Sequence, residues 1–394
     1  MTQPINQTQN ADIIVVGAGL VGLAAAVAMA RQNRTVVLVD AKKPEIKKHQ
    51  SWDERVYALT PGTVSWLQAL GVWEEMDLTR VSDIHAMHLW GEASADPLVL
   101  GNHDANLPKL GVIVESQNLM YALWQQIDAL GVIVVTDAKC KYIENTQQHI
   151  WLGLEDGTEI SAKLIIAADG VNSWVRQQAD IALKQRDFHQ TAIVANFLAE
   201  KSHQHVARQW FAPHETLALL PLPEKYVSMV WSVSTESANE LLTLSSDELA
   251  QKVGAQSRHV LGVLRPVGKI LSFRLNQQTA VQLIAERVAL VGDVAHQVHP
   301  MAGQGVNLGF RDVMQLESLV SATHALQDIG ETTFLRKYER SRQADIATMN
   351  ALTTGLDELF ASDINLVKKW THWGMRQLNQ QATIKKLLIQ QAVA

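Results

Sequence analysis

The chain has 394 residues, of which 47% are hydrophobic and 19% charged, and its formal net charge is -6 at pH 7. This length predicts two connected domains, and the composition is that of a folded globular protein. The chain lacks the basic excess expected of a nucleic-acid-binding protein, so we expect no nucleic-acid partner. Its single cysteine, Cys140, excludes an intramolecular disulfide and suits a reducing compartment.

Residues 13–30 form an uncharged run with the apolar character of a membrane span. Residues 1–12 contain no Lys or Arg, whereas a signal peptide begins with basic residues. The run also contains three glycines at the spacing of a strand-to-helix turn. We therefore expect a buried strand over residues 13–16, a glycine turn and a helix to about Arg31, and no membrane span.

The glycine turn has the pattern that binds the pyrophosphate of a dinucleotide. Gly17 would permit the tight bend, Gly19 would let the backbone approach the phosphates, and Gly22 would let helix and strand pack closely. A second apolar strand over residues 35–39 ends at Asp40, 18 residues after Gly22 (40 − 22 = 18). An acid at this spacing suits a hydrogen bond to an adenosine ribose, so the segment predicts dinucleotide binding.

Two later strands also end in an acid. Residues 164–168 are apolar and precede Asp169, and residues 288–291 precede Gly292 and Asp293. A glycine-rich loop then leads into a helix that we expect to begin near Asn307, with backbone amides available to a ligand. Three strands that are each followed by an acidic residue, arranged around one cofactor, indicate a long dinucleotide and favour FAD over NAD.

Three motifs together carry a resemblance to a known family. GAGLVG near the start, ADGVNSWVR in the middle and GDVAHQVHPMAGQGVNLGFRD late in the chain resemble the single-component flavoprotein aromatic hydroxylases. The HPMAGQGVNLG portion is most similar to the branch that hydroxylates polyprenyl phenols and benzoquinols in ubiquinone biosynthesis. The resemblance covers about residues 11–355.

The resemblance implies an α/β fold. Its Rossmann-like FAD-binding domain of the glutathione-reductase type would be discontinuous, made of residues 1–75, 104–183 and 273–355. A substrate-binding β-sheet domain would comprise residues 76–103 and 184–272, since the second stretch has the short alternating runs of an antiparallel sheet. Residues 356–394 would form a C-terminal helical segment. Packed helices with solvated lysines are one expectation for it, and docking on a membrane or a partner is the other.

The resemblance also implies a set of site residues. The cofactor-binding residues would be Gly17, Ala18, Gly19, Leu20, Gly22, Asp40, Arg55, Gln117, Asp169, Asp293, Gly303, Gly305, Val306 and Asn307. Gln117 stands where many relatives have arginine. At the reacting ring, Pro300 would direct its carbonyl toward flavin and substrate. His296 and His299 would orient the loop through hydrogen bonds, and either could influence proton movement near the ring. His296 and His299 lack a third ligand at metal spacing, so we expect no metal.

The predicted antiparallel sheet would wall an apolar substrate pocket over the flavin. We expect this pocket to be lined by Phe211, Leu220, Pro221 and Trp231. The chain has 11 tryptophans, and packing in the core is the alternative for each of those we considered.

The leading hypothesis is FAD-dependent hydroxylation of a polyprenylated phenol or benzoquinol. NAD(P)H would reduce the flavin transiently, because there is no second glycine fingerprint, and dioxygen would form a flavin hydroperoxide that delivers oxygen to the ring. A flavin-linked prenyl reductase or dehydrogenase and a non-catalytic scaffold subunit of a quinone-synthesis complex are the alternatives. We expect a cytoplasmic protein, with peripheral association at the inner membrane face and quinone-biosynthesis partners as further expectations.

Overall fold

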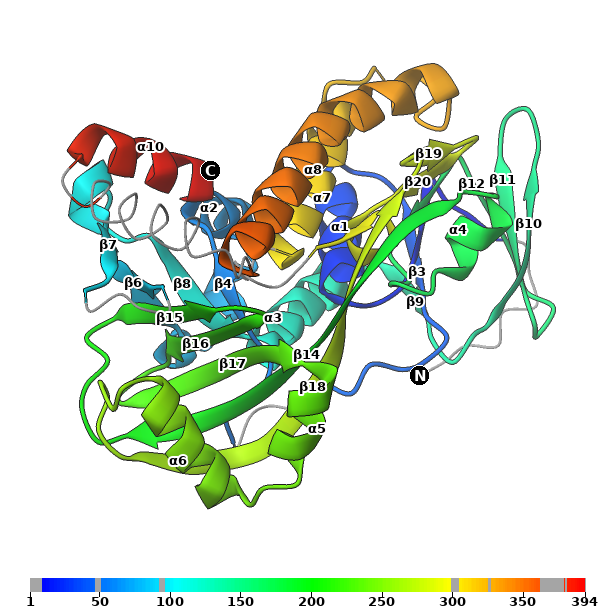
Figure 1. Ribbon diagram of the computed structural model, residues 1–394. Coiled ribbons are helices and arrows are strands. Elements are labelled where there is room, and N and C mark those ends of the chain that lie inside the picture. The colour runs from blue at the N-terminus through cyan, green and yellow to red at the C-terminus, as the bar shows by residue number, and fades with distance from the viewer. Residues whose placement is uncertain are drawn as a thin grey trace.

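The computed structural model describes residues 9–46, 51–91, 96–298, 305–324, 327–361, 379 and 381–393. Over these ranges the chain combines helices with four β-sheets (Figure 1). The α/β class expected from the sequence is confirmed.

A six-stranded sheet contains the glycine turn. Its strands lie in the order β19 (Ile284–Ala285), β20 (Val288–Leu290), β13 (Leu164–Ala167), β2 (Ile13–Val16), β3 (Val36–Val39) and β9 (Ile133–Val135). Neighbouring strands are parallel, except that β19 and β20 are antiparallel. The sequence predicts four strands that are followed by an acid or a glycine, and all four are present as β2, β3, β13 and β20. They are buried, as continuous apolar runs in a parallel sheet require.

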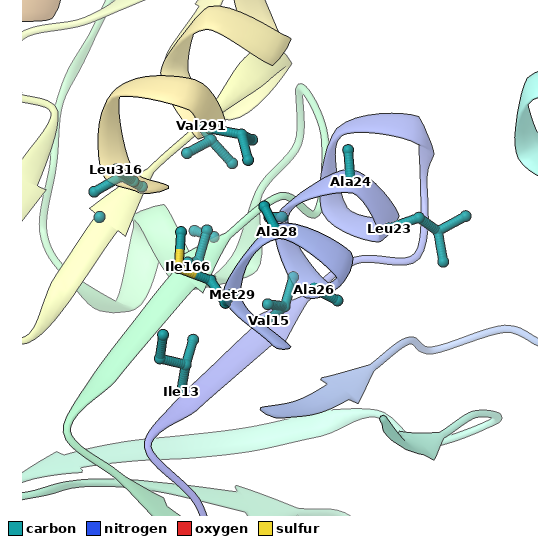
Figure 2. Packing of buried hydrophobic residues seen from close by; sticks show 14 of the residues in the cluster. Ile13, Val15, Leu23, Ala24, Ala26, Ala28, Met29, Ile166, Val291 and Leu316 are labelled. Atoms are coloured by element: carbon teal, nitrogen blue, oxygen red, sulfur yellow. The ribbon is translucent and has the colours of Figure 1, made fainter. Parts of the chain in front are cut away.

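Helix α1 (Leu20–Arg31) packs on this sheet with every residue from Gly22 to Met29 buried. Its neighbours are α3 (Ser116–Ala129) and α7 (Gly305–Ser321). Figure 2 shows α1 side chains packed over β2 and β13, with Leu316 of α7 beside them. The many alanines let the helix approach closely. Asn33, at a φ of +56°, then turns the chain into β3.

Two smaller sheets flank this core. One has the order β1 (Gln9–Asn10), β12 (Glu159–Ala162), β11 (Ile150–Leu154) and β10 (Cys140–Asn145). The other has the order β4 (Val56–Leu59), β8 (Gly111–Glu115) and β5 (Ser82–Ile84). Helix α2 (Pro61–Ala69) follows β4 in the chain, and α4 (Trp174–Gln178) follows β13.

An eight-stranded sheet forms the second large part of the molecule. Its order is β21 (His296–Gln297), β18 (Leu264–Ala280), β14 (Leu183–Ala199), β17 (Tyr226–Ser234), β16 (Glu215–Pro221), β15 (Val206–Ala212), β6 (Ala86–Trp90) and β7 (Leu98–Gly101). The pairs are antiparallel, except that β15 and β6 are parallel. The short runs predicted within residues 184–272 are thus strands of one sheet, and β6 and β7 join it.

The two faces of this sheet meet different parts of the molecule. Helices α5 (Thr235–Leu242) and α6 (Ser246–Gln256) cover one face, here called the outer face, with Leu241 and Leu249 in its apolar cluster. The opposite, inner face is directed toward β4, β8 and β5. Asn196 of β14 lies on this inner face and donates from Nδ2 to the Asp53 carbonyl at 2.9 Å.

Two C-terminal helices complete the described chain, α8 (Thr332–Ala361) and α10 (Ala382–Val393). Lys385 of α10 lies 2.7 Å from Asp104, and Ile389 is 2% exposed in an apolar cluster with Leu110. The expectation of solvated lysines is therefore wrong for Lys385, while residues 366–370 lie outside the described ranges. Within those ranges no helix is long and apolar enough to cross a membrane.

Candidate cofactor and substrate site

Four parallel strands of the six-stranded sheet end in one row. Val16 pairs with Val39 on one side and with Ala167 on the other, and Ala167 pairs with Leu290. The residues just beyond these ends are Gly17, Asp40, Ala168–Asp169 and Gly292–Asp293. Because the chain leaves β2 toward β3 on one side while β13 lies on the other, this edge is a switch point, where open α/β sheets bind ligands.

The glycine turn leaves an open cradle at this edge. Gly17 has a φ of +107°, and a Cβ atom there would lie 2.3 Å from the Ala168 carbonyl oxygen. A Cβ atom on Gly22 would lie 1.9 Å from the Gly17 oxygen, whereas one on Gly19 would meet nothing within 4 Å. Gly19 is also the N-cap of α1 and supplies no side-chain hydrogen bond. The first amides of α1 thus face open space, which fits a pyrophosphate at a helix N-terminus.

Asp40 borders this cradle. Its Oδ2 accepts from the Ala18 amide at 2.6 Å and its Oδ1 accepts from the Lys42 amide at 2.8 Å. The two bonds fix the carboxylate at the end of β3, beside the glycine turn. A ribose joined to a pyrophosphate in the cradle would lie within its neighbourhood, and a hydrogen bond from that ribose to Asp40 remains a prediction.

Asp169 serves the start of α4 in this structure. Its carboxylate accepts from the Ser173 hydroxyl at 2.6 Å and from the amides of Trp174 and Val175 at 2.7 and 3.1 Å. Burial raises its pKa above the ordinary value, and these hydrogen bonds oppose that shift. The carboxylate therefore holds the turn after β13, and its contact with a cofactor remains a prediction.

Asp293 follows β20 and remains accessible to solvent, although protein surrounds it closely. This burial raises the pKa of its carboxyl group, while the nearby His296 opposes the shift. An accessible carboxyl group just beyond a strand end suits hydrogen bonding to a hydroxylated chain, such as the ribityl chain of FAD.

A buried charged network fixes the segment around Asp293. His296 Nε2 lies 2.6 Å from Asp312 Oδ2, which also accepts from the Gly292 amide at 2.8 Å. Arg342 Nε donates to Asp312 Oδ1 at 2.7 Å. Burial alone would raise the pKa of Asp312, but His296, Arg342 and the hydrogen bonds hold it below its ordinary value.

This network agrees with the loop-orienting role predicted for the histidine pair at His296. The sequence contains no signal for Arg342, because it lies 30 residues beyond Asp312 and meets it through the packing of α8 on α7. Within the described part of the chain, no group of three or more His, Cys, Asp or Glu side chains is arranged to hold a metal ion.

Asp53 brings two of the predicted residues together. Its carboxylate accepts from the Arg55 amide at 3.0 Å and from the Gln117 amide at 2.9 Å. The Arg55 guanidinium is exposed and lies 4.7 Å over the ring of Phe273. Gln117 Oε1 is buried and has no hydrogen-bond partner among the described residues. Such an orphaned acceptor fits a site completed by a bound donor group.

Asn307 connects the start of α7 to β4 and α2. Its Oδ1 accepts from the Thr60 amide at 3.1 Å and from the Thr63 hydroxyl at 2.9 Å, and its Nδ2 donates to the Ala58 carbonyl at 2.7 Å. The side chain is therefore used within the protein. Gly305 and Val306 also lie in this first turn of α7. Its main-chain groups are available for the predicted contact with the cofactor.

Three predicted site residues, His299, Pro300 and Gly303, lie outside the described residues. The predicted reacting loop is therefore bounded on one side by β21 and on the other by the first turn of α7.

The predicted substrate-pocket residues divide between the two faces of the eight-stranded sheet. Leu220 packs on the inner face near β8. Phe211 shares that face, because its neighbour Trp210 belongs to the outer-face cluster. Trp231 belongs to the outer-face cluster itself and donates to Glu215 at 2.7 Å.

Pro221 pairs directly with Val227, which is in the same outer-face cluster. Trp231 and Pro221 therefore lie on the face covered by α5 and α6, opposite Leu220 and Phe211, and their place in a substrate pocket stays a prediction. Side chains alternate along a strand, and the sequence alone left open which alternate set pointed inward.

Tyr57 of β4 is a site residue that the sequence analysis did not single out. Burial raises the pKa of its phenol, Ser116 and Arg55 lower it, and the neighbouring Asp293 raises it further. Tyr57 is therefore close enough to Arg55 and Asp293 for their charges to act on its phenol. The available signal was its position two residues after Arg55.

Comparisons with known proteins agree with this geometry. A family model described as an FAD binding domain matches residues 10–352. Ubiquinone hydroxylase UbiL of Rhodospirillum rubrum is 32% identical over 97% of this chain and 89% of its own length. Human ubiquinone biosynthesis monooxygenase COQ6 is 31% identical, covering 96% of this chain and 91% of that protein. The 3-demethoxyubiquinol 3-hydroxylase of Escherichia coli is 31% identical, with 91% of each chain covered.

Solved structures share the fold. The p-nitrophenol 4-monooxygenase PnpA of Pseudomonas putida superposes with a TM-score of 0.79 at 15% identity, covering 98% of both chains. A variant of Klebsiella pneumoniae HpxO complexed with FAD gives a TM-score of 0.75 at 18% identity, covering 97% of this chain and 98% of that one. With the open cradle, the accessible acids at the strand ends and these matches, the chain belongs to the FAD-dependent monooxygenase family that contains the ubiquinone-biosynthesis hydroxylases.

Proposed function

We propose that this protein hydroxylates the aromatic ring of a polyprenylated phenol or benzoquinol in ubiquinone biosynthesis, with NAD(P)H as electron donor and dioxygen as oxygen source. The observation that carries the proposal is the open glycine cradle at the switch point, in a chain similar over almost its whole length to ubiquinone hydroxylases. The substrate is assigned from the names of these relatives, and the site supplies the features that their chemistry needs.

Bound FAD, once reduced, supplies the activation of dioxygen. The protein therefore has to bind the cofactor, orient the substrate ring beside it and exclude water. The α1 amides behind Gly19 would hold the pyrophosphate and Asp40 the adenosine ribose. Asp293 would bond the ribityl chain. The first turn of α7 would present Val306 and Asn307 main-chain groups to the ring.

The inner face of the eight-stranded sheet would cover the reacting ring. Leu220 packs there with Ile84 and Ile113, which come from β5 and β8. This apolar contact joins the sheet to β5 and β8, and it would help to exclude water from the reacting ring. An apolar wall also suits a substrate whose ring carries a long hydrocarbon tail.

The substrate's tail partitions into lipid, so we propose that the protein works in the cytoplasm and meets its substrate at the inner membrane face. Contact with other quinone-biosynthesis proteins would likewise bring the substrate to this protein. Within the terminal stretch from residue 356, residues 366–370 are our candidate for either contact, because they combine lysines with apolar residues while Lys385 and Ile389 of α10 are engaged within the protein.

A deletion strain tests the biological assignment. We expect it to accumulate one prenylated ring lacking a hydroxyl group and to recover when the gene is restored. A variant gene with Gly19→Glu, which directs a carboxylate into the cradle, should fail to restore it although the protein accumulates. Normal ubiquinone in the deletion strain, or recovery with the Gly19→Glu gene, would contradict the proposal.

A further inference from the structure

A recess on the described surface lies outside the cofactor crevice. It has a cavity volume of about 370 Å³ and lies where the start of β14, the end of β18 and the middle of α8 meet. Lys184 and Arg186 line it from β14, Gln277 and Thr279 from β18, and Gln343 and Ile346 from α8. This volume falls within the range of ligand pockets.

The lining combines cations with an apolar floor. Lys184 and Arg186 are exposed, and none of the described residues that line the recess carries a carboxylate. The nearest acid along the strand, Asp187, is bonded to Arg274 at 2.6 Å. Val281, which also lines the recess, is an exposed apolar residue, so apolar surface lies beside the charges. This chemistry suits a ligand with phosphates and a planar ring.

The recess is joined to the cofactor site through two elements. Thr279 of β18 pairs with His296 of β21, so the two strands share backbone hydrogen bonds. On the other wall, Gln343 follows Arg342, whose guanidinium bonds to Asp312 in the network beneath Gly292. A ligand in the recess would therefore lie against the two elements that fix the Asp293 segment.

We infer that this recess binds the adenosine-phosphate part of the NAD(P)H donor, an inference that rests on the proposed function. The chain has one glycine fingerprint, which the FAD site uses, so the donor needs another anion-binding surface. Lys184 and Arg186 would contact its phosphates, and the apolar floor would take the adenine. The donor would give a hydride, two electrons with one proton, to the bound FAD and leave as NAD(P)+.

Anaerobic reduction of the FAD-loaded protein tests this assignment. Flavin absorbance is followed at increasing concentrations of NADPH and of NADH, giving a Kd for each donor and a limiting rate. Replacing both cations, Lys184→Ala with Arg186→Ala, should raise the donor Kd at least about tenfold, as expected for two charged hydrogen bonds in an exposed site. FAD content and reduction by dithionite should not change.

Lys225→Ala and Arg265→Ala are the matched controls, since both side chains are exposed and lie outside the recess. They should leave the donor Kd within about twofold. Competition by ADP against NADPH should weaken in the double variant to the same extent as donor binding. An unchanged donor Kd in the double variant would overturn the inference, and so would equal effects of the controls.

A second measurement separates this inference from the proposed function. FAD-loaded protein is reduced with dithionite, freed of reductant and mixed with dioxygen and a prenylated phenol. Ring hydroxylation in this single turnover would uphold the proposed function whatever the donor result. If neither NADPH nor NADH reduces the native protein, the recess assignment falls, even when the single turnover succeeds.

Discussion

Gly19 and Gly22 lie three residues apart, yet an added methyl group would meet different surroundings at the two positions. At Gly22 it would lie 1.9 Å from the Gly17 oxygen, but at Gly19 it meets nothing within 4 Å. Gly22→Ala should therefore destabilise the apoprotein by about 1–3 kcal/mol through overpacking. Gly19→Ala should leave apoprotein stability unchanged and raise the Kd for FAD about tenfold, because the methyl group enters the cradle.

Thermal unfolding of the apoproteins and titration with FAD, followed by flavin fluorescence, distinguish these effects. Equal FAD affinity of Gly19→Ala and the native protein would contradict the placement of the pyrophosphate at this turn.

Cys140 is the only cysteine and lies near two of the site's acids. Burial raises the pKa of its thiol to about 12, and Asp169 and Asp40 add to the shift. At pH 8 only about one molecule in ten thousand would carry the thiolate. We expect iodoacetamide to leave Cys140 unmodified in the folded protein at pH 8 and to alkylate it in urea, as measured by mass spectrometry. Rapid alkylation of the native protein would contradict this environment.

The sequence predicts the residues whose type is dictated by backbone geometry. Gly17 and Asp40 directly follow strands, and Gly22 lies in the first turn of α1, where only certain residue types fit, so their placement follows from local pattern. The orientation of Trp231 does not, because it depends on the register of β17 in the sheet. The engagement of Asp169 with α4 also depends on how the chain turns after the strand.

The elements β21, α7 and α8 are joined by one buried carboxylate, Asp312. Asp312→Asn should destabilise the protein by about 3 kcal/mol, because it leaves Arg342 and His296 without their anion. Asp345→Asn is a matched control, since Asp345 also bonds Arg342 but is 28% exposed. Its effect should be below about 1 kcal/mol. Denaturant unfolding measures both, and equal effects would contradict the importance of the buried pair.

The network also has a pH dependence with a defined sign. The pKa of Asp312 is lower in the folded protein than its ordinary value of 3.8. Its contribution to stability is therefore present above that value and is lost as the pH falls through the lower folded-state pKa. We expect the free energy of unfolding to fall with acidification below about pH 4, and Asp312→Asn to reduce that slope. The same slope in the variant and the native protein would contradict this sign.

At the scale of elements, the short buried strands were predicted more accurately than the long ones. β2 is a continuous apolar run, so its bounds follow from composition. β14 and β18 are 17 residues long, and much of each is exposed or only partly buried. Their register also shifts between Asp187 and Gln190. These features interrupt the alternation from which strands are predicted, so neither strand's length could be read from the sequence.

At the scale of the whole molecule, α10 packs against the apolar cluster on the inner face of the eight-stranded sheet. Ile389 is 2% exposed there, whereas Ile384 on the same helix is 38% exposed. Ile389→Ala should cost about 2–5 kcal/mol of local stability and release α10, while Ile384→Ala should not. Hydrogen exchange of residues 382–393 measures this, and FAD content should be the same in both variants. Unchanged protection in Ile389→Ala would contradict the docking of α10.

The molecule as a whole brings a dinucleotide crevice against an apolar sheet face, an arrangement suited to adding oxygen to a ring away from water. Incubation of the FAD-loaded protein with NADPH, a prenylated phenol and ¹⁸O₂ tests this most directly. One ¹⁸O atom should appear in each product molecule, with none from labelled water. Turnover without dioxygen, or a product whose new oxygen comes from water, would contradict the assignment as a ring monooxygenase.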